Sequence, residues 1–150
     1  MPTDDRDRVL EVLDDAECRR LLGAVPVGHL GFTDGALPAI LPVQFTVDDD
    51  CIRIPAREGN RIIDAVRRSV VAVAVDDYDV GDRTGWGVTV VGPAQVVPAG
   101  SRDGAPSRAG PLTAGRSVIV VQMGLLRGWR LSLPAVMATE ASGARTGVAG

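Results

Sequence analysis

The residues that could carry chemistry are few, and their spacing excludes several familiar catalytic sites. The sequence contains no Ser-His-Asp set and no cluster of side chains with metal-ligand spacing. Cys18 and Cys51 lack CxxC spacing and a nearby histidine, so we interpret them as reduced, mostly buried thiols. The only histidine, His29, lies in an apolar stretch and is interpreted as a packing or surface residue. We therefore assign no catalytic residue and no metal site.

A second chemical feature is a polar segment that contains Arg57, Asn60 and Arg61 and precedes an apolar helical pattern. Asn60 has the side chain of a helix N-cap. Taken alone, the residues favour a solvated helix start for Arg57 and Arg61 over a ligand site.

Hydrophobic periodicity predicts the elements that would position these residues. A first helix begins at the D-x-x-E pair Asp14 and Glu17 and ends before Pro26, and a second follows Arg61. Strands are predicted at 27–33, 38–47, 51–54, 70–76, 86–97 and 117–123, with a further turn and strand within 124–133. Six strands with two helices fit an antiparallel barrel plugged by helices better than a sandwich.

Length and composition predict one domain over residues 1–150. Residues 98–116 have the composition of a mobile loop, and 138–150 that of a disordered tail. A net charge of -3 and scattered arginines make nucleic acid an unexpected partner. No apolar run reaches the roughly 20 residues of a membrane helix, and the acidic N-terminus lacks a signal-peptide core, so we expect a cytoplasmic protein that binds no membrane.

Four segments, in order, resemble the pyridoxamine 5'-phosphate oxidase-like family of FMN-binding split β-barrels, in its actinobacterial form. They are the opening helix with Cys18, then VPVGHLGFTDGALPAILPVQF, AREGNRIIDAV and RTGWGVTVVGPAQVV. Together with the strand VVAVAVDD they extend from Asp14 to Val97. The resemblance implies a mainly β fold, a six-stranded antiparallel split β-barrel with short helices. It also implies a homodimer that holds FMN in a cleft at the subunit interface.

The resemblance implies a phosphate site at the turn before the second helix. Its residues in this chain are Arg57, Asn60 and Arg61. Family members often carry a further arginine or histidine at the end of the preceding strand, where this chain has Ile54 and Pro55. One expected phosphate or substrate contact is therefore missing from the pattern.

The resemblance also implies which residues surround the flavin ring. Pro42, Val43 and Gln44 match the strand whose backbone edges the isoalloxazine, and Gln44 could donate its amide to a ring carbonyl. Proline cannot donate to a sheet ladder, so Pro42 predicts an edge or a break, which protection against aggregation would equally explain. Trp86 and Val88 match the start of the long strand that contributes to the pocket, although a tryptophan there can also cap a barrel end.

The function implied is that of an FMN-dependent oxidoreductase or reductase acting on a small organic substrate. The flavin would supply the electron chemistry, so the absence of a catalytic side-chain set does not argue against an enzyme. The alternative is a non-catalytic module that binds flavin, deazaflavin F420 or haem, or a split barrel that has lost its cofactor. The sequence identifies neither the substrate nor the electron partner.

Overall fold

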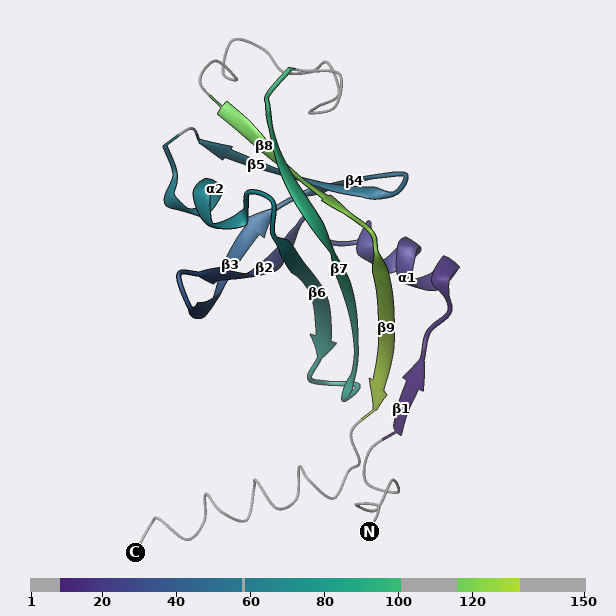
Figure 1. Cartoon of the computed structure of the whole chain (residues 1–150). Helices are drawn as coiled ribbons and strands as arrows, with labels where there is room; N and C mark the ends of the chain where they lie inside the picture. The colour runs from purple at the N-terminus through teal and green to yellow at the C-terminus, as the bar shows by residue number, and fades with distance from the viewer. Residues whose placement is uncertain (1–8, 58, 101–115, 133–150) are drawn as a thin grey trace, which may run out of the picture.

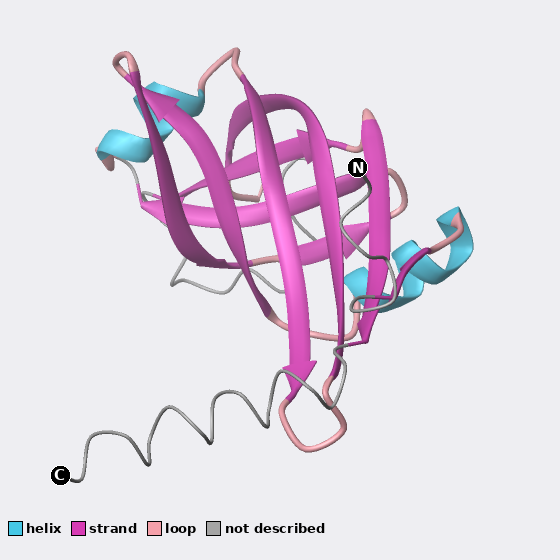
Figure 2. Ribbon diagram, turned by 90° about the horizontal axis from the view of Figure 1, so that it is seen from below, coloured by secondary structure: helices cyan, strands magenta, loops and turns pink. Residues whose placement is uncertain are grey.

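Nine strands and two short helices make up residues 9–57, 59–100 and 116–132, the part of the chain that the computed structural model describes. In chain order they are β1 (Val9–Val12), α1 (Asp15–Leu22), β2 (Val27–Asp34), β3 (Leu37–Gln44), β4 (Thr46–Asp48), β5 (Cys51–Arg57), α2 (Arg61–Val66), β6 (Val70–Asp79), β7 (Thr84–Pro98), β8 (Arg116–Gln122) and β9 (Leu125–Ser132). Figures 1 and 2 show the strands curving around a common interior with a helix on either side. The predicted mainly β, antiparallel fold is confirmed.

The strands pair in the order β3-β2-β6-β7-β8-β5-β4, and β9 joins β7 while β1 joins β9. The 15-residue strand β7 connects two parts of this sheet. Its first part pairs with β6 and β9, and its last residues, from Ala94 to Pro98, pair with β8. A Cβ atom on Gly92 would lie 1.7 Å from the carbonyl oxygen of Gln122, so only glycine fits there. The backbones of β7 and β8 therefore approach closely at Gly92.

The predicted strand 38–47 is interrupted at Phe45. Before this residue β3 pairs with β2, and after it β4 pairs with β5, so the chain crosses from one part of the sheet to the other. Phe45 is only 7% exposed, because its side chain turns into the core at the crossing. Apolar residues recur throughout 38–47, so the sequence pattern did not indicate this break.

Strand β1 was not predicted. The structure has nine strands because β1, β4 and the further strand β9 add to the six predicted for the barrel. The four residues of β1 are too few for a clear alternation, and the one described strand that pairs with it, β9, lies far away in the sequence. The remaining predicted strands lie close to their expected bounds. A tight hairpin turn, which the Asp34-Gly35 dipeptide favours, joins β2 to β3, with Gly35 at φ 65°.

The core lies between the inward faces of the strands. Its fully buried residues are mostly aliphatic, including Leu30, Val73, Val90, Ile52 and Val121. Helix α1 covers one side through Leu22 and Cys18, and the Cys18 thiol packs so closely on Gly128 that a Cβ there would lie 2.5 Å from the sulfur. Burial raises the pKa of the Cys18 thiol, which suits the predicted role as a buried, unreactive side chain.

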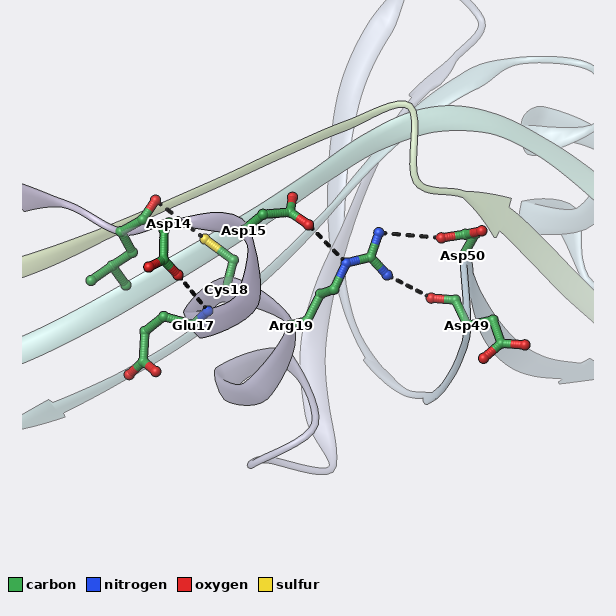
Figure 3. A network of polar contacts seen from close by, with 8 residues as sticks. Asp14, Asp15, Glu17, Cys18, Arg19, Asp49 and Asp50 are labelled. Carbon is green, nitrogen blue, oxygen red and sulfur yellow. Dashed lines mark hydrogen bonds and ion pairs between the residues drawn. The ribbon is translucent and has the colours of Figure 1, made fainter.

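Helix α1 is fixed at both its start and its exposed side (Figure 3). Asp14 is its N-cap and accepts a 2.8 Å hydrogen bond from the backbone N–H of Glu17, as predicted. Arg19 pairs with Asp15 at 3.0 Å and with Asp50 at 3.2 Å, and donates to the carbonyl of Asp49 at 2.8 Å. These contacts connect α1 to the turn between β4 and β5.

Two sequence predictions concern residues that the structure does not describe. Residues 101–115 of the predicted mobile loop and the whole predicted tail, 138–150, lie outside the described residues. Within the described part, neither helix has the length and apolar composition needed to span a membrane.

Candidate functional site

The predicted phosphate residues gather at the turn between β5 and α2. Arg57 ends β5, and its carbonyl accepts a 3.1 Å hydrogen bond from the N–H of Asn60. Asn60 is the N-cap of α2, with its side-chain oxygen 3.1 Å from the N–H of Ile62. Gly59 allows the sharp turn through its φ of 78°. The cap predicted at Asn60 is confirmed, and it holds Arg57 and Arg61 on either side of one tight turn.

Two charged neighbours of this turn were not predicted. Nη2 of Arg61 lies 3.3 Å from Oδ2 of Asp34, the last residue of β2, although the Arg61 side chain remains 85% exposed. Arg116 on β8 lies directly across the ladder from Arg57. Among the described residues, neither Arg57 nor Arg116 forms an ion pair with a carboxylate. At this end of the molecule, Arg57 and Arg116 therefore have no described carboxylate partner, whereas Arg61 has Asp34.

Strand β3 carries the residues predicted to edge a flavin ring. It ends the strand order, so its outer edge has no described strand beside it, in agreement with the edge predicted from Pro42. Pro42 and Gln44 are exposed, while Val43 is half-buried against the core. Leu37 pairs with Asp34, so β3 begins beside the residue that contacts Arg61. From Leu37 to Pro42 the strand rises about 17 Å.

The structure does not bring Trp86 and Val88 together with these residues in one chain. Val88 is 1% exposed and belongs to the core. Trp86 is half-buried at the far end of β7, where it lies across from Asp77 of β6 and Arg130 of β9 and lines a small cavity. Pro42 is three strands away from β7, and the alternation of the ladder places it on the opposite face of the sheet from Trp86.

The face of the sheet that points away from the core is broadly apolar. We call it the outer face; its residues alternate with the core residues on β1, β2, β3, β6, β7 and β9. Several of its aliphatic side chains are strongly exposed, namely Val12 (76%), Ile40 (71%), Val70 (67%) and Leu125 (53%). Gly31, Ala72 and Ala74 keep its middle flat, and His29 lies there opposite Pro42. An exposed apolar surface of this kind is typical of an interaction site.

The described residues contain no group of three or more His, Cys, Asp or Glu side chains arranged to hold a metal ion. The strongest shift of a carboxyl pKa is at Glu17, outside the predicted site. The hydrogen bonds from Arg20 and Arg130 lower the pKa of Glu17 to about 2. This carboxylate stabilises the packing of α1 on β9 and lies away from the arginine-rich turn.

Comparisons with known proteins give one family and a set of shared folds. A family model described as pyridoxamine 5'-phosphate oxidase matches residues 14–118. An uncharacterized protein of Mycobacterium tuberculosis is 43% identical over 90 residues, which are 57% of this chain and 59% of that protein. This chain thus spans less than two thirds of that relative's length.

Solved structures with the same fold include two described as FAD-binding proteins. The one from Mycobacterium smegmatis is 25% identical, with a TM-score of 0.64 over 81% of this chain and 98% of that chain. The one from Mesorhizobium loti is 20% identical, with a TM-score of 0.65 over 83% of this chain and 98% of that chain. These structures share the split-barrel fold predicted for this sequence.

Proposed function

Because the chain belongs to the pyridoxamine 5'-phosphate oxidase family, we propose that it is a flavoprotein that binds FMN and acts as an oxidoreductase on a small organic molecule. The observation that carries this proposal is the position of Arg57 and Arg61 beside the start of an open-edge strand, β3. The M. smegmatis structure is described as an FAD-binding protein, which supports a flavin as the cofactor of this chain. FMN and FAD share the ring and the first phosphate, so the same residues could serve either cofactor.

In this proposal the phosphate is held by the arginines of the β5–α2 turn. Arg57 has no carboxylate partner among the described residues, so its guanidinium is available to a phosphate without loss of an ion pair. Arg61 would exchange part of its exposed contact with Asp34 for the phosphate. Asn60 uses its oxygen for the helix cap, which leaves its amide N–H groups as further donors. Charge-assisted hydrogen bonds of this kind contribute about 1.5 to 3 kcal/mol each.

The ring of the flavin would lie against β3. An extended ligand that starts at Arg61 can follow this strand toward Pro42, where the open edge leaves main-chain groups without a described partner. Gln44 would donate its amide to a ring carbonyl, and Val43 would support the ring from its half-buried position. When bound, the flavin supplies the electron transfer, and the protein contributes position and a dry environment.

We also propose that the protein is a homodimer that associates through the outer face. Ile40 on this face is 71% exposed and Leu125 is 53% exposed, and water contact with such side chains costs about 25 cal/mol per Å². Pro42 lies on this outer face, opposite His29, so a second copy docked there would cover a ring bound beside Pro42, whereas Trp86 lies on the opposite face of the sheet. The cofactor cleft would then be complete only in the dimer.

The visible absorption spectrum of the freshly purified protein tests the cofactor, and chromatography of the released chromophore separates FMN from FAD. We expect a flavin spectrum that bleaches when a nicotinamide nucleotide or dithionite is added without oxygen. A protein that stays colourless after incubation with FMN and with FAD would instead favour the alternatives without a flavin. A flavin spectrum with no turnover of any electron acceptor would favour a non-catalytic flavin module.

A further inference from the structure

A second cationic site lies at the other end of α2 from Arg61. Arg67 and Arg68, which follow the helix directly, line a cavity of about 440 Å³ together with the β7 segment Pro93–Val97. The six residues of α2 separate this cavity from the β5–α2 turn by about 9 Å of helix rise. It is therefore distinct from the proposed flavin phosphate site.

The turn that carries the two arginines is firmly held. The N–H of Arg67 donates to the carbonyl of Ile63 at 3.1 Å, and the N–H of Ser69 donates to that of Val66 at 3.0 Å. The hydroxyl of Ser69 donates to the carbonyl of Ala65 at 3.2 Å. Between them Arg68 has a φ of 58°, a left-handed conformation that costs a non-glycine residue roughly 1 kcal/mol or more. A charged residue is thus kept where glycine or asparagine would fit with less strain.

The charge of this pair is not compensated. In the described part of the chain, no carboxylate lies within ion-pair distance of Arg67 or Arg68, and both side chains are exposed. Because both arginines line one cavity, an anionic ligand bound there would be attracted by both positive charges. Guanidinium groups bind phosphate through paired hydrogen bonds.

The wall formed by β7 adds a hydrogen-bond donor and an apolar surface. Strand β6 pairs with β7 only as far as Pro93, and the N–H of Ala94 then donates to the carbonyl of Ser69 at 2.8 Å. The alternation of the ladder points the N–H of Val96 to the same side, where no described strand continues. Pro93 and Val97 contribute apolar surface to the cavity, and Gln95 contributes a carboxamide.

We propose that this cavity binds a nucleoside phosphate. The two arginines and the N–H of Val96 bind the phosphate, the apolar side chains contact the nucleoside, and Gln95 hydrogen-bonds the base or the sugar. The volume falls within the range of 300 to 1,000 Å³ that is typical of small-molecule sites, and it exceeds what a bare phosphate ion would fill. The ligand is either a free nucleotide or the adenosine phosphate half of FAD, which have the same chemistry.

Calorimetric titration of the full chain with ADP, adenosine and inorganic phosphate tests this site. We expect ADP to bind more tightly than either fragment, and Arg68→Gln and Arg67→Gln each to weaken ADP binding by about tenfold or more. The matched control is Arg83→Gln, which removes the same charge from another left-handed residue, φ 55°, in the β6–β7 turn. ADP binding that is unchanged in both variants, or absent from the parent protein, would overturn the proposal. Phosphate binding as tight as that of ADP would overturn the nucleoside part.

A second titration, with FAD and FMN, identifies the source of the ligand. If FAD binds more tightly than FMN and Arg68→Gln removes the difference, the cavity holds the adenosine half of the cofactor. If the two flavins bind alike while ADP binding depends on Arg68, the ligand is a separate nucleotide. ADP binding requires no flavin, so this site and the proposed flavin site can fail independently.

Discussion

Arg61 at the start of α2 lies 3.3 Å from Asp34 at the end of β2, and because Asp34 pairs with Leu37 this contact connects the proposed phosphate site to the beginning of β3. The carboxylate also competes with a phosphate for the guanidinium. We predict that Asp34→Asn increases the affinity for FMN by about twofold to fivefold, the range expected for an exposed ion pair. Riboflavin, which has no phosphate, should bind equally well to both proteins in fluorescence titrations. A loss of FMN affinity would mean that Asp34 supports the site and does not compete with it.

The proposed dimer makes a second prediction, about Ile40. A charge at the centre of a buried apolar interface is costly, so Ile40→Asp should convert the dimer into a monomer at micromolar concentration. Light scattering coupled to gel filtration measures the change. Val80→Asp is the control, because Val80 is 78% exposed in the β6–β7 turn and does not belong to the outer face. A parent protein that is already monomeric would exclude the dimer.

The ion pairs of Glu17 predict how stability depends on pH. The hydrogen bond from Arg20, with a further contribution from Arg130, lowers the pKa of Glu17 from 4.5 to about 2 in the folded protein. Because the folded pKa is the lower one, the carboxylate stabilises the fold above its unfolded pKa, and this contribution is lost as pH falls toward about 2. Glu17→Gln should therefore lower the urea midpoint at neutral pH and have little effect near the folded pKa. A midpoint difference that stays constant with pH would contradict this assignment.

The close approach at Gly92 predicts a large loss of stability on substitution. The Cβ of Gly92→Ala would lie 1.7 Å from the backbone oxygen of Gln122. That oxygen is held in place because Gln122 pairs with Cys51 of β5 and the preceding Val121 pairs with Ala94 of β7. We expect a loss of about 3 kcal/mol or more in the free energy of unfolding. On the same strand, a Cβ at Gly87 meets its nearest atom at 3.9 Å, so Gly87→Ala should change stability by only about 0.5 kcal/mol.

Features set by neighbouring residues could be predicted from the sequence. The caps at Asp14 and Asn60 depend on hydrogen bonds to residues two or three positions away, and the hairpin at Gly35 depends on one backbone angle. In each case the type of one residue decides the local backbone conformation.

Features set by distant residues could not be predicted in the same way. Strand β1 exists because β9 offers it an edge, and the crossing at Phe45 exists because two different strands receive the chain on either side. The position of Arg116 directly across the ladder from Arg57 depends on the register between β5 and β8, which no local sequence pattern encodes. The cavity beside Arg67 likewise depends on where β6 stops pairing with β7.

The central claim is that the arginines of the β5–α2 turn hold the phosphate of a flavin. Arg61→Ala should leave the fold intact, because the side chain is 85% exposed, and the position of the arginine allows a test that separates phosphate binding from folding. Arg53 is unsuitable as a control, since its side chain is only 15% exposed and pairs with Asp48. The control is therefore Arg83→Ala, because Arg83 lies in the distant β6–β7 turn.

Fluorescence titration of FMN and riboflavin against the parent protein, Arg61→Ala and Arg83→Ala is the most direct measurement. We predict that Arg61→Ala weakens FMN binding by about tenfold to a hundredfold, from the loss of one charge-assisted hydrogen bond. Riboflavin binding should be the same in all three proteins, and Arg83→Ala should bind FMN as the parent does. Unchanged FMN affinity in Arg61→Ala, or a parent protein that binds no flavin, would contradict the account.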